Sequence, residues 1–281
     1  MKFKRFAAVT AALGVVVAGG IVASSASAEV VSNSYVLVGS DTLQDAANAL
    51  ANGTNITGTR VRVTSSGGDT IGSFDAFPGT GTGSQIQTKP GGPTFLRPSG
   101  SGNGVTALRA SITGAAWGGK TITGQVDVAR SSSGPGTNQN SDGKLAYVPF
   151  GRDALSYIYK GGTAAWANLT AAQLKQIYEG TLTSIDGVAV NPRLPQSGSG
   201  TRSFFLTAIG NPSLKAGIDT GNTTAENDAT VLAAGEIIPF SVASWVARRA
   251  RQPGRRCVAR HRYRHRDRAE RGVLRQHHLR S

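Results

Sequence analysis

The stretch RLPQSGSGTRSFFLTAIG, residues 193–210, decides how we interpret this chain. Its first half is small, polar and rich in glycine, and its second half is apolar enough to pack as a helix. A loop that leads into a helix leaves backbone N–H groups without intrahelical partners, beside the positive end of the helix dipole. Ser199 and Thr201 add hydroxyl groups, Gly200 lets a ligand approach the backbone, and Arg202 adds a positive charge. The loop predicts an anion site, and the alternative is an N-capped helix behind a flexible loop.

Similar turns occur earlier in the chain, each next to a predicted strand or helix. A predicted strand is followed by Ser40, Asp41 and Thr42, one of which we expect to cap the next helix. Ser101 lies in a second Ser/Gly loop before a helix, and Ser132 lies in a hydroxyl cluster after a strand. Helices of α/β folds begin at the carboxyl ends of strands, where ligands bind. We therefore expect these turns to lie together at one site.

Strands alternate with helices along the body of the chain. This order predicts an α/β fold with two lobes, in which mostly parallel sheets are flanked by helices. The expected strands cover residues 34–39, 60–65, 121–129, 145–150, 154–160 and 236–240, and the expected helices cover 43–50, 105–112 and 170–180 and begin again at 203 and 241.

Charge is distributed unevenly over the 281 residues. The net charge is +14, but residues 29–246 contain 14 basic and 14 acidic residues, so the body is neutral. All four histidines and the single cysteine, Cys257, lie after residue 246. A body without these residue types excludes Ser-His-Asp and Cys-His catalytic centres and a typical zinc site. We expect no metal, no cofactor and no enzyme activity, although a Ser/Lys hydrolase using Ser40 or Ser199 is an alternative.

The N-terminus has the pattern of an export signal. A basic segment at residues 2–5 precedes an apolar run that is broken by glycine, and Ala26-Ser27-Ala28 fits a cleavage site. We expect cleavage after residue 28 and a secreted, soluble protein outside the cytoplasmic membrane. No cysteine follows the apolar run, so we expect no lipid anchor at this position.

The order of short motifs resembles one family. GSDT at 39–42, SGSGNG at 99–104, DVARSSS at 127–133, LTAAQLKQIYEGTLTSID at 169–186, SGSGT at 197–201 and GEIIPFS at 235–241 look like the substrate-binding proteins of phosphate ABC transporters, and more broadly the type II periplasmic-binding-protein fold. The resemblance covers about residues 33–246. It implies a monomeric hinged receptor that closes on an oxyanion and delivers it to a membrane permease. Lobe 1 would cover about 29–150 and lobe 2 about 151–235.

The resemblance also implies site residues, and two family positions differ here. The matching donors are Ser40, Thr42, Ser101, Ser199, Gly200 and Thr201. The family carries an aspartate that accepts a proton from phosphate where this chain has Ser132, and an arginine where this chain has Pro195. Arg202, Arg193 or Arg130 are the candidates for the missing positive charge.

Residues 247–281 differ in composition from the body. They contain 13 arginines and only Asp267 and Glu270 as acids. We interpret this segment as a disordered or loosely helical tail produced by a shift of reading frame, which would leave the first lobe incomplete. The alternative is a basic arm that binds nucleic acid or another polyanion. The leading hypothesis for the body is oxyanion capture for ABC-transporter uptake, and its alternative is a secreted adhesion or sensing module of the same fold.

Overall fold

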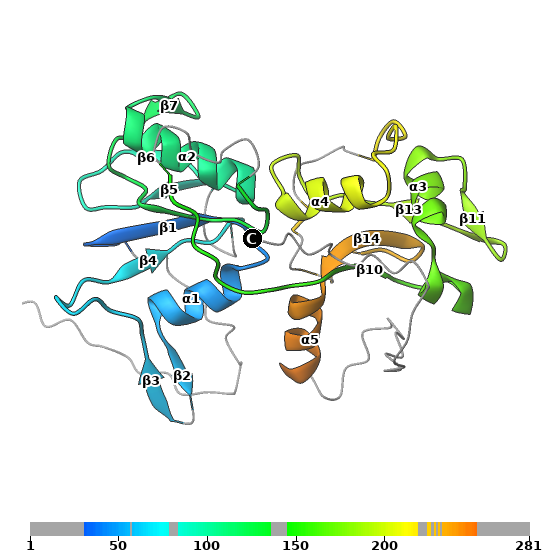
Figure 1. Ribbon diagram of the computed structural model, residues 1–281, viewed down its shortest axis with the longest axis horizontal. Helices are drawn as coiled ribbons and strands as arrows, with labels where there is room; N and C mark the ends of the chain where they lie inside the picture. The colour runs from blue at the N-terminus through cyan, green and yellow to red at the C-terminus, as the bar shows by residue number, and fades with distance from the viewer. Residues whose placement is uncertain are drawn as a thin grey trace, which may run out of the picture.

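The structure, a computed structural model, describes residues 31–56, 58–78, 84–135, 145–218, 224, 225, 228, 230 and 232–251. The expected export signal and most of the arginine-rich tail lie outside these residues. The described chain forms two lobes joined by an extended crossover before strand β10 (Figure 1). None of the helices in the described part has the length and apolar character needed to cross a membrane.

Lobe 1 is built on a parallel sheet of three strands in the order β4-β1-β9. These strands are β1 (Tyr35–Gly39), β4 (Ile71–Ser73) and β9 (Val128–Arg130), and Leu37 pairs with Ser73 on one side and Val128 on the other. Helix α1 (Gln44–Asn52) lies below the sheet in Figure 1 and helix α2 (Ser101–Thr113) lies above it. The fold therefore places both helix starts at the carboxyl edge of β1.

Three short hairpins surround this sheet. They pair β2 (Thr54–Ile56) with β3 (Thr59–Val61), β5 (Gln85–Gln87) with β6 (Thr94–Leu96), and β7 (Ala116–Trp117) with β8 (Lys120–Thr121). The lobe 1 core lies between the sheet, α2 and the β5–β6 hairpin, and its buried residues are Val36, Val38, Phe74, Ile86, Phe95, Ala107, Ala110, Ile122 and Val126. Burial of these side chains is the main force that holds the lobe together.

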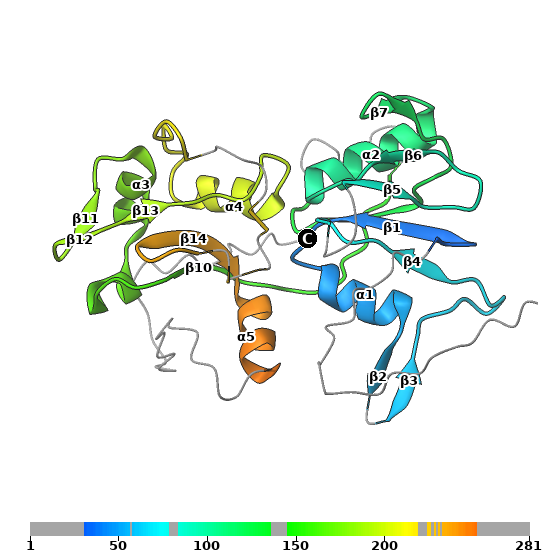
Figure 2. The same ribbon diagram turned by 180° about the vertical axis from the view of Figure 1, so that it is seen from behind.

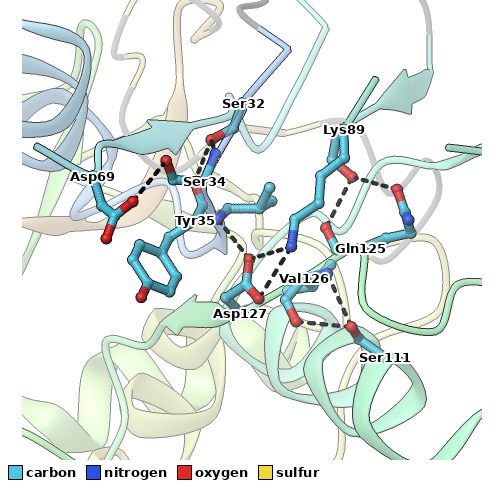
Figure 3. Close-up of polar contacts among 11 residues, drawn as sticks. Ser32, Ser34, Tyr35, Asp69, Lys89, Ser111, Gln125, Val126 and Asp127 are labelled. Atoms are coloured by element: carbon cyan, nitrogen blue, oxygen red, sulfur yellow. Dashed lines mark hydrogen bonds and ion pairs between the residues drawn. The ribbon is translucent and has the colours of Figure 1, made fainter. Parts of the chain in front are cut away.

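Polar contacts fix the amino ends of β1 and β9 (Figure 3). The Asp127 carboxylate accepts a hydrogen bond from Val36 N at 2.9 Å and pairs with Lys89 Nζ at 2.9 Å. The Ser111 hydroxyl of α2 donates to Val126 O and accepts from Val126 N, which joins the helix to the approach to β9. Lys89 and Asp127 therefore pair with each other inside lobe 1, at the edge of the sheet opposite the helix starts.

Lobe 2 contains a mixed sheet in the order β10-β14-β13. Strand β10 (Leu155–Tyr159) is antiparallel to β14 (Glu236–Ser241), and β13 (Asn191–Pro192) is parallel to it. The 3-10 helix η2 (Ala164–Asn168), helix α3 (Ala171–Glu179), hairpin β11 (Ser184–Ile185) with β12 (Val188–Ala189), helix α4 (Gly200–Ala208) and helix α5 (Val242–Arg251) complete the lobe. Helices α3 and α4 lie on one side of the sheet and α5 on the other (Figures 1 and 2).

Strand β14 contributes side chains to the cores on both faces of its sheet, because successive residues of a strand point to opposite faces. Ile237 packs into the core beneath α3 and α4, which includes Tyr178 and Phe205. Ile238 and Phe240 point the other way and pack with Ile158, Leu232 and the α5 residue Trp245. Because β14 is the central strand, lobe 2 extends to at least residue 241, beyond the expected limit of 235.

The α/β prediction is confirmed, with three differences in detail. Residues 145–150 form no strand, and Val148 and Phe150 are 84% and 61% exposed, because this segment crosses between lobes without a neighbouring strand. The expected strand 60–65 is shortened to Thr59–Val61 in an exposed hairpin. The expected strand 121–129 is interrupted by a turn in which Gly124 has a φ of 70°, so only Val128–Arg130 joins the sheet.

Helix α5 carries the chain into the tail. It continues to Arg251, so the backbone stays helical past residue 247. The rest of the tail lies outside the described residues, and its state stays a prediction.

Candidate functional site

The first two predicted turns lie side by side in lobe 1. Gly39, at the end of β1, forms a parallel bridge with Ser99, just before α2. A Cβ atom on Gly104 would lie 2.6 Å from the Gly39 Cα, so α2 begins directly against the end of β1. Ser40 N donates to Arg130 O at 3.1 Å, which adds the end of β9 to the same corner. These two turns and the end of β9 therefore lie at one edge of the lobe 1 sheet.

The hydroxyls of Ser101 and Ser132 form a pair at this corner. Their Oγ atoms are 3.0 Å apart, and Ser101 Oγ also accepts from Ser132 N at 2.9 Å. Ser101 is the first residue of α2 and is 1% exposed. Two predicted site residues that are 31 positions apart in the sequence therefore act as one polar group.

The turn after β1 is buried and closed on itself. Ser40 and Thr42 share a hydrogen bond of 2.7 Å between their hydroxyls, and Asp41 is 1% exposed. None of the three caps α1, whose N-cap residue is Leu43 and has no side-chain cap. The expected cap is wrong because Gln44 N bonds to the backbone oxygen of Asp41 in a tight turn before the helix starts.

Arg130 is a buried arginine that supports this turn from behind. Its Nε donates to Ser40 O at 2.9 Å, Nη1 to Ser73 Oγ at 2.6 Å and Nη2 to Phe74 O at 2.7 Å. Burial lowers the pKa of Arg130 to about 10, while the carboxylates of Asp75 and Asp41 raise it, so the guanidinium stays charged at neutral pH. Arg130 is one of the candidates for the missing family arginine, and its donors join the turn at Ser40 to Ser73 and Phe74 at the end of β4.

The loop before α4 brings lobe 2 against lobe 1. Helix α4 begins at Gly200, with Ser199 as its N-cap accepting from Arg202 N at 3.0 Å, so the N-capped helix of the alternative interpretation is present. Gly102 N of α2 donates to Gly198 O at 2.9 Å. The amino ends of α2 and α4, each carrying a partial positive charge, therefore meet between the lobes.

Gly200 is the closest point of this contact. A Cβ at this position would lie 2.5 Å from Ser132 Oγ and 2.7 Å from Ser101 Oγ. Thr201, the next residue, is 6% exposed. The structure thus brings Ser101, Ser132 and the Gly200-Thr201 pair into one region, from three separate parts of the sequence.

The other two candidate arginines have partners within lobe 2. Arg202 Nη1 donates to Pro195 O at 3.1 Å. Arg193 Nη1 forms an ion pair with Glu236 Oε1 at 3.2 Å, and its Nη2 donates to Thr224 Oγ1. Arg193 therefore connects the loop before α4 to β14.

One residue at this interface was missed by the sequence reasoning. Gln196 is 3% exposed, and its amide lies against Gly100, the N-cap residue of α2. A glutamine in a Ser/Gly loop resembles any solvated polar residue, so its sequence position carries no signal of burial. A tertiary contact of this kind becomes visible only when the two lobes are placed together.

Comparison with known proteins identifies the family of this chain. The PBP superfamily domain matches residues 24–248. Among solved structures, the chain is similar to one described as a phosphate ABC transporter substrate-binding protein with bound phosphate from Clostridium perfringens, with 16% sequence identity, a TM-score of 0.42 and coverage of 75% of this chain and 71% of that chain. No curated protein matches the sequence. Since the family match spans most of the sequence, this chain belongs to the PBP superfamily.

Proposed function

We propose that this chain captures phosphate or a related oxyanion between its two lobes and delivers it to a membrane ABC permease. It acts by binding, without catalysis, metal or cofactor. The observation that supports this proposal best is the meeting of the α2 and α4 amino ends at Gly102 and Gly198. Two helix ends of equal polarity repel one another, and an anion between them offsets that repulsion.

The side chains around this junction suit an oxyanion. Ser101, Ser132, Ser199 and Thr201 offer hydroxyl groups. Arg130 adds a buried positive charge behind Ser40 and Asp41. Arg202, on the first turn of α4, supplies a second positive charge in lobe 2. This arrangement favours a small, multiply charged ligand over an apolar one.

Export and delivery complete the proposal. The segment 1–28 would direct secretion without a lipid anchor, and the soluble monomer would present its closed form to the permease. The family resemblance supports this step, because such receptors exchange ligand with membrane partners. Closure of the lobes around the ligand would exclude water and commit the anion to transport.

Isothermal titration of the full chain with phosphate, sulfate and other oxyanions tests the proposal. Thr201→Val keeps the shape of the side chain and removes its hydroxyl, so it should weaken anion binding by about 1–3 kcal/mol. Ser199→Ala should weaken binding as well, but it also removes the α4 N-cap, which costs about 1 kcal/mol of stability. The double replacement of Ser199 and Thr201 by alanine should weaken binding more than Thr201→Val.

Thr207→Val is the matched control, because Thr207 lies on the same helix and its hydroxyl donates to Ser203 O on an exposed face. It should leave the affinity unchanged. A folded chain that binds no oxyanion would favour the adhesion or sensing module. Salt-dependent DNA binding that disappears when residues 248–281 are deleted would favour the polyanion-binding alternative.

A further inference from the structure

The amide of Gln196 is buried between the lobes without a partner. Gln196 is 3% exposed, and neither Nε2 nor Oε1 has a hydrogen-bond partner among the residues that the structure describes. A primary amide carries two donors and an acceptor, and a buried amide whose groups stay unpaired destabilises the state that buries it. The contact between the lobes therefore leaves a donor and an acceptor that a bound group would satisfy.

The position of this amide ties it to the interlobe junction. A Cβ on Gly100 would lie 2.8 Å from Gln196 Nε2 and 2.7 Å from Gly198 O, so the amide packs directly on the N-cap residue of α2. Ser199 N, at the N-cap of α4, donates to Gln196 O at 3.0 Å. Gln196 thus lies beside the amino ends of both helices, where the proposed anion would bind.

We propose that Gln196 contacts the bound anion through both ends of its amide and makes the site select a tetrahedral oxyanion that retains a proton. This inference rests on the proposed function. Hydrogenphosphate and hydrogenarsenate offer oxygens that accept from Nε2 and an O–H that donates to Oε1. Sulfate, which carries no proton at neutral pH, offers acceptors alone and leaves Oε1 buried and unpaired.

Selection by an amide differs from selection by a charged side chain because an amide does not change its protonation with pH. An amide does not titrate in the range where proteins are stable, so its acceptor is present at every working pH. Hydroxyls such as those of Ser101 and Ser132 rotate and either donate or accept, so they discriminate weakly between the two kinds of anion. An acceptor that cannot become a donor is what rejects a fully deprotonated ligand.

Two replacements of Gln196 test the inference by titration of the full chain with inorganic phosphate, arsenate and sulfate. Gln196→Met removes both the donor and the acceptor at similar length, so the ratio of phosphate to sulfate affinity should fall by about tenfold. Gln196→Glu replaces the donor with a second acceptor, so sulfate binding should weaken more than phosphate binding and the ratio should rise. Arsenate should follow phosphate in every variant.

Gln176→Met is the matched control, since Gln176 lies on an exposed position of α3 in the same lobe, and it should leave the ratio unchanged. Thermal melts of each variant check that it is folded. Equal weakening of phosphate and sulfate binding in the Met variant, or an unchanged affinity ratio in both variants, would mean that Gln196 only supports the loop or binds water. Either outcome would overturn this inference and leave the proposed function standing. Absence of binding to every anion by the unmutated, folded chain would overturn the proposed function and this inference with it.

Discussion

Gly200 shows how a single residue sets the distance between the lobes. Its backbone lies so close to the Ser101 and Ser132 hydroxyls that no Cβ fits without movement. Gly200 is helical and is not among the glycines with positive φ, so its conformation suits alanine. The requirement for glycine therefore arises from close approach between lobes and not from the backbone.

Gly200→Ala should weaken oxyanion affinity by at least about tenfold, because the added methyl group holds the lobes apart. The stability of α4 should stay the same or rise by up to about 1 kcal/mol, since alanine is the better helix former. Titration calorimetry and a thermal melt separate these two effects. Gly102→Ala is the control: its Cβ would lie 3.4 Å from Gly198 O, an ordinary contact, so affinity should change little. Equal affinities for both variants would contradict the close approach.

At the scale of elements, local signals set the helices and distant contacts set the strands. Helix α3 follows its sequence closely: Thr170 and Gln173 form a reciprocal capping box, and Gly180 ends the helix with a φ of 79°. Helix α4 starts three residues earlier than expected, because Ser199 caps it from within the Ser/Gly loop. The predicted anion loop is therefore partly the first turn of the helix.

The second lobe also has partly or fully buried tyrosines on its edge strand β10 and on α3. Tyr157 OH donates to Trp166 O and accepts from Leu169 N, both at 2.8 Å. Burial raises the pKa of Tyr157 to about 12. The hydrogen bond from Leu169 N opposes this shift, and the neighbouring Tyr159 adds to it. Burial also raises the pKa values of Tyr159 and Tyr178.

These shifts predict a loss of stability in alkaline solution. The folded state holds the Tyr157 proton between pH 10 and 12, whereas the unfolded chain releases it, so the free energy of unfolding should fall as pH rises through this window. Tyr157→Phe should lower stability at neutral pH by about 1–3 kcal/mol, because two hydrogen bonds are lost. The same variant should show a smaller fall above pH 10 in denaturant titrations. An identical alkaline fall in both proteins would contradict the burial of this hydroxyl.

At the scale of the whole molecule, two separate cores meet through polar groups. The cluster around Phe74 belongs to lobe 1 and the cluster around Trp166 belongs to lobe 2. The junction between lobes consists of backbone, hydroxyl and amide groups at Gly102, Gly198 and Gly200. Such an interface opens at low cost, because little apolar surface is exposed when the lobes separate.

The hydrogen bond from Gly102 N to Gly198 O should report closure directly. Phosphate should slow hydrogen exchange at Gly102 by at least about tenfold, because the amide exchanges when the lobes open. The amide of Val126, which donates to Ser111 within lobe 1, is the control and should change little. Equal protection of both amides would indicate general stabilisation in place of closure. The expectations of a monomer, an incomplete first lobe and a disordered remainder of the tail stay predictions.

Much of the architecture could be predicted from the sequence, because it depends on local patterns. Apolar runs, caps and glycine ends marked α3, α4, β1 and β14, and the motif order pointed to the periplasmic-binding-protein fold, in agreement with the PBP superfamily match. Local patterns gave wrong predictions where the structure depends on long-range contacts. Residues 145–150 have the apolar character of a strand but meet no partner strand, and a strand forms only where a neighbour accepts its hydrogen bonds.

The sequence by itself determined that Ser101, Ser199 and Thr201 lie at helix starts and that Ser132 follows a strand, because turn and helix chemistry acts within a few residues. The tertiary structure alone decided what these turns face. It turned Arg130 inward to support Ser40, paired Ser101 with Ser132, and buried the amide of Gln196 between the lobes. Burial and pairing depend on which distant segments share a surface, and no local pattern encodes that proximity.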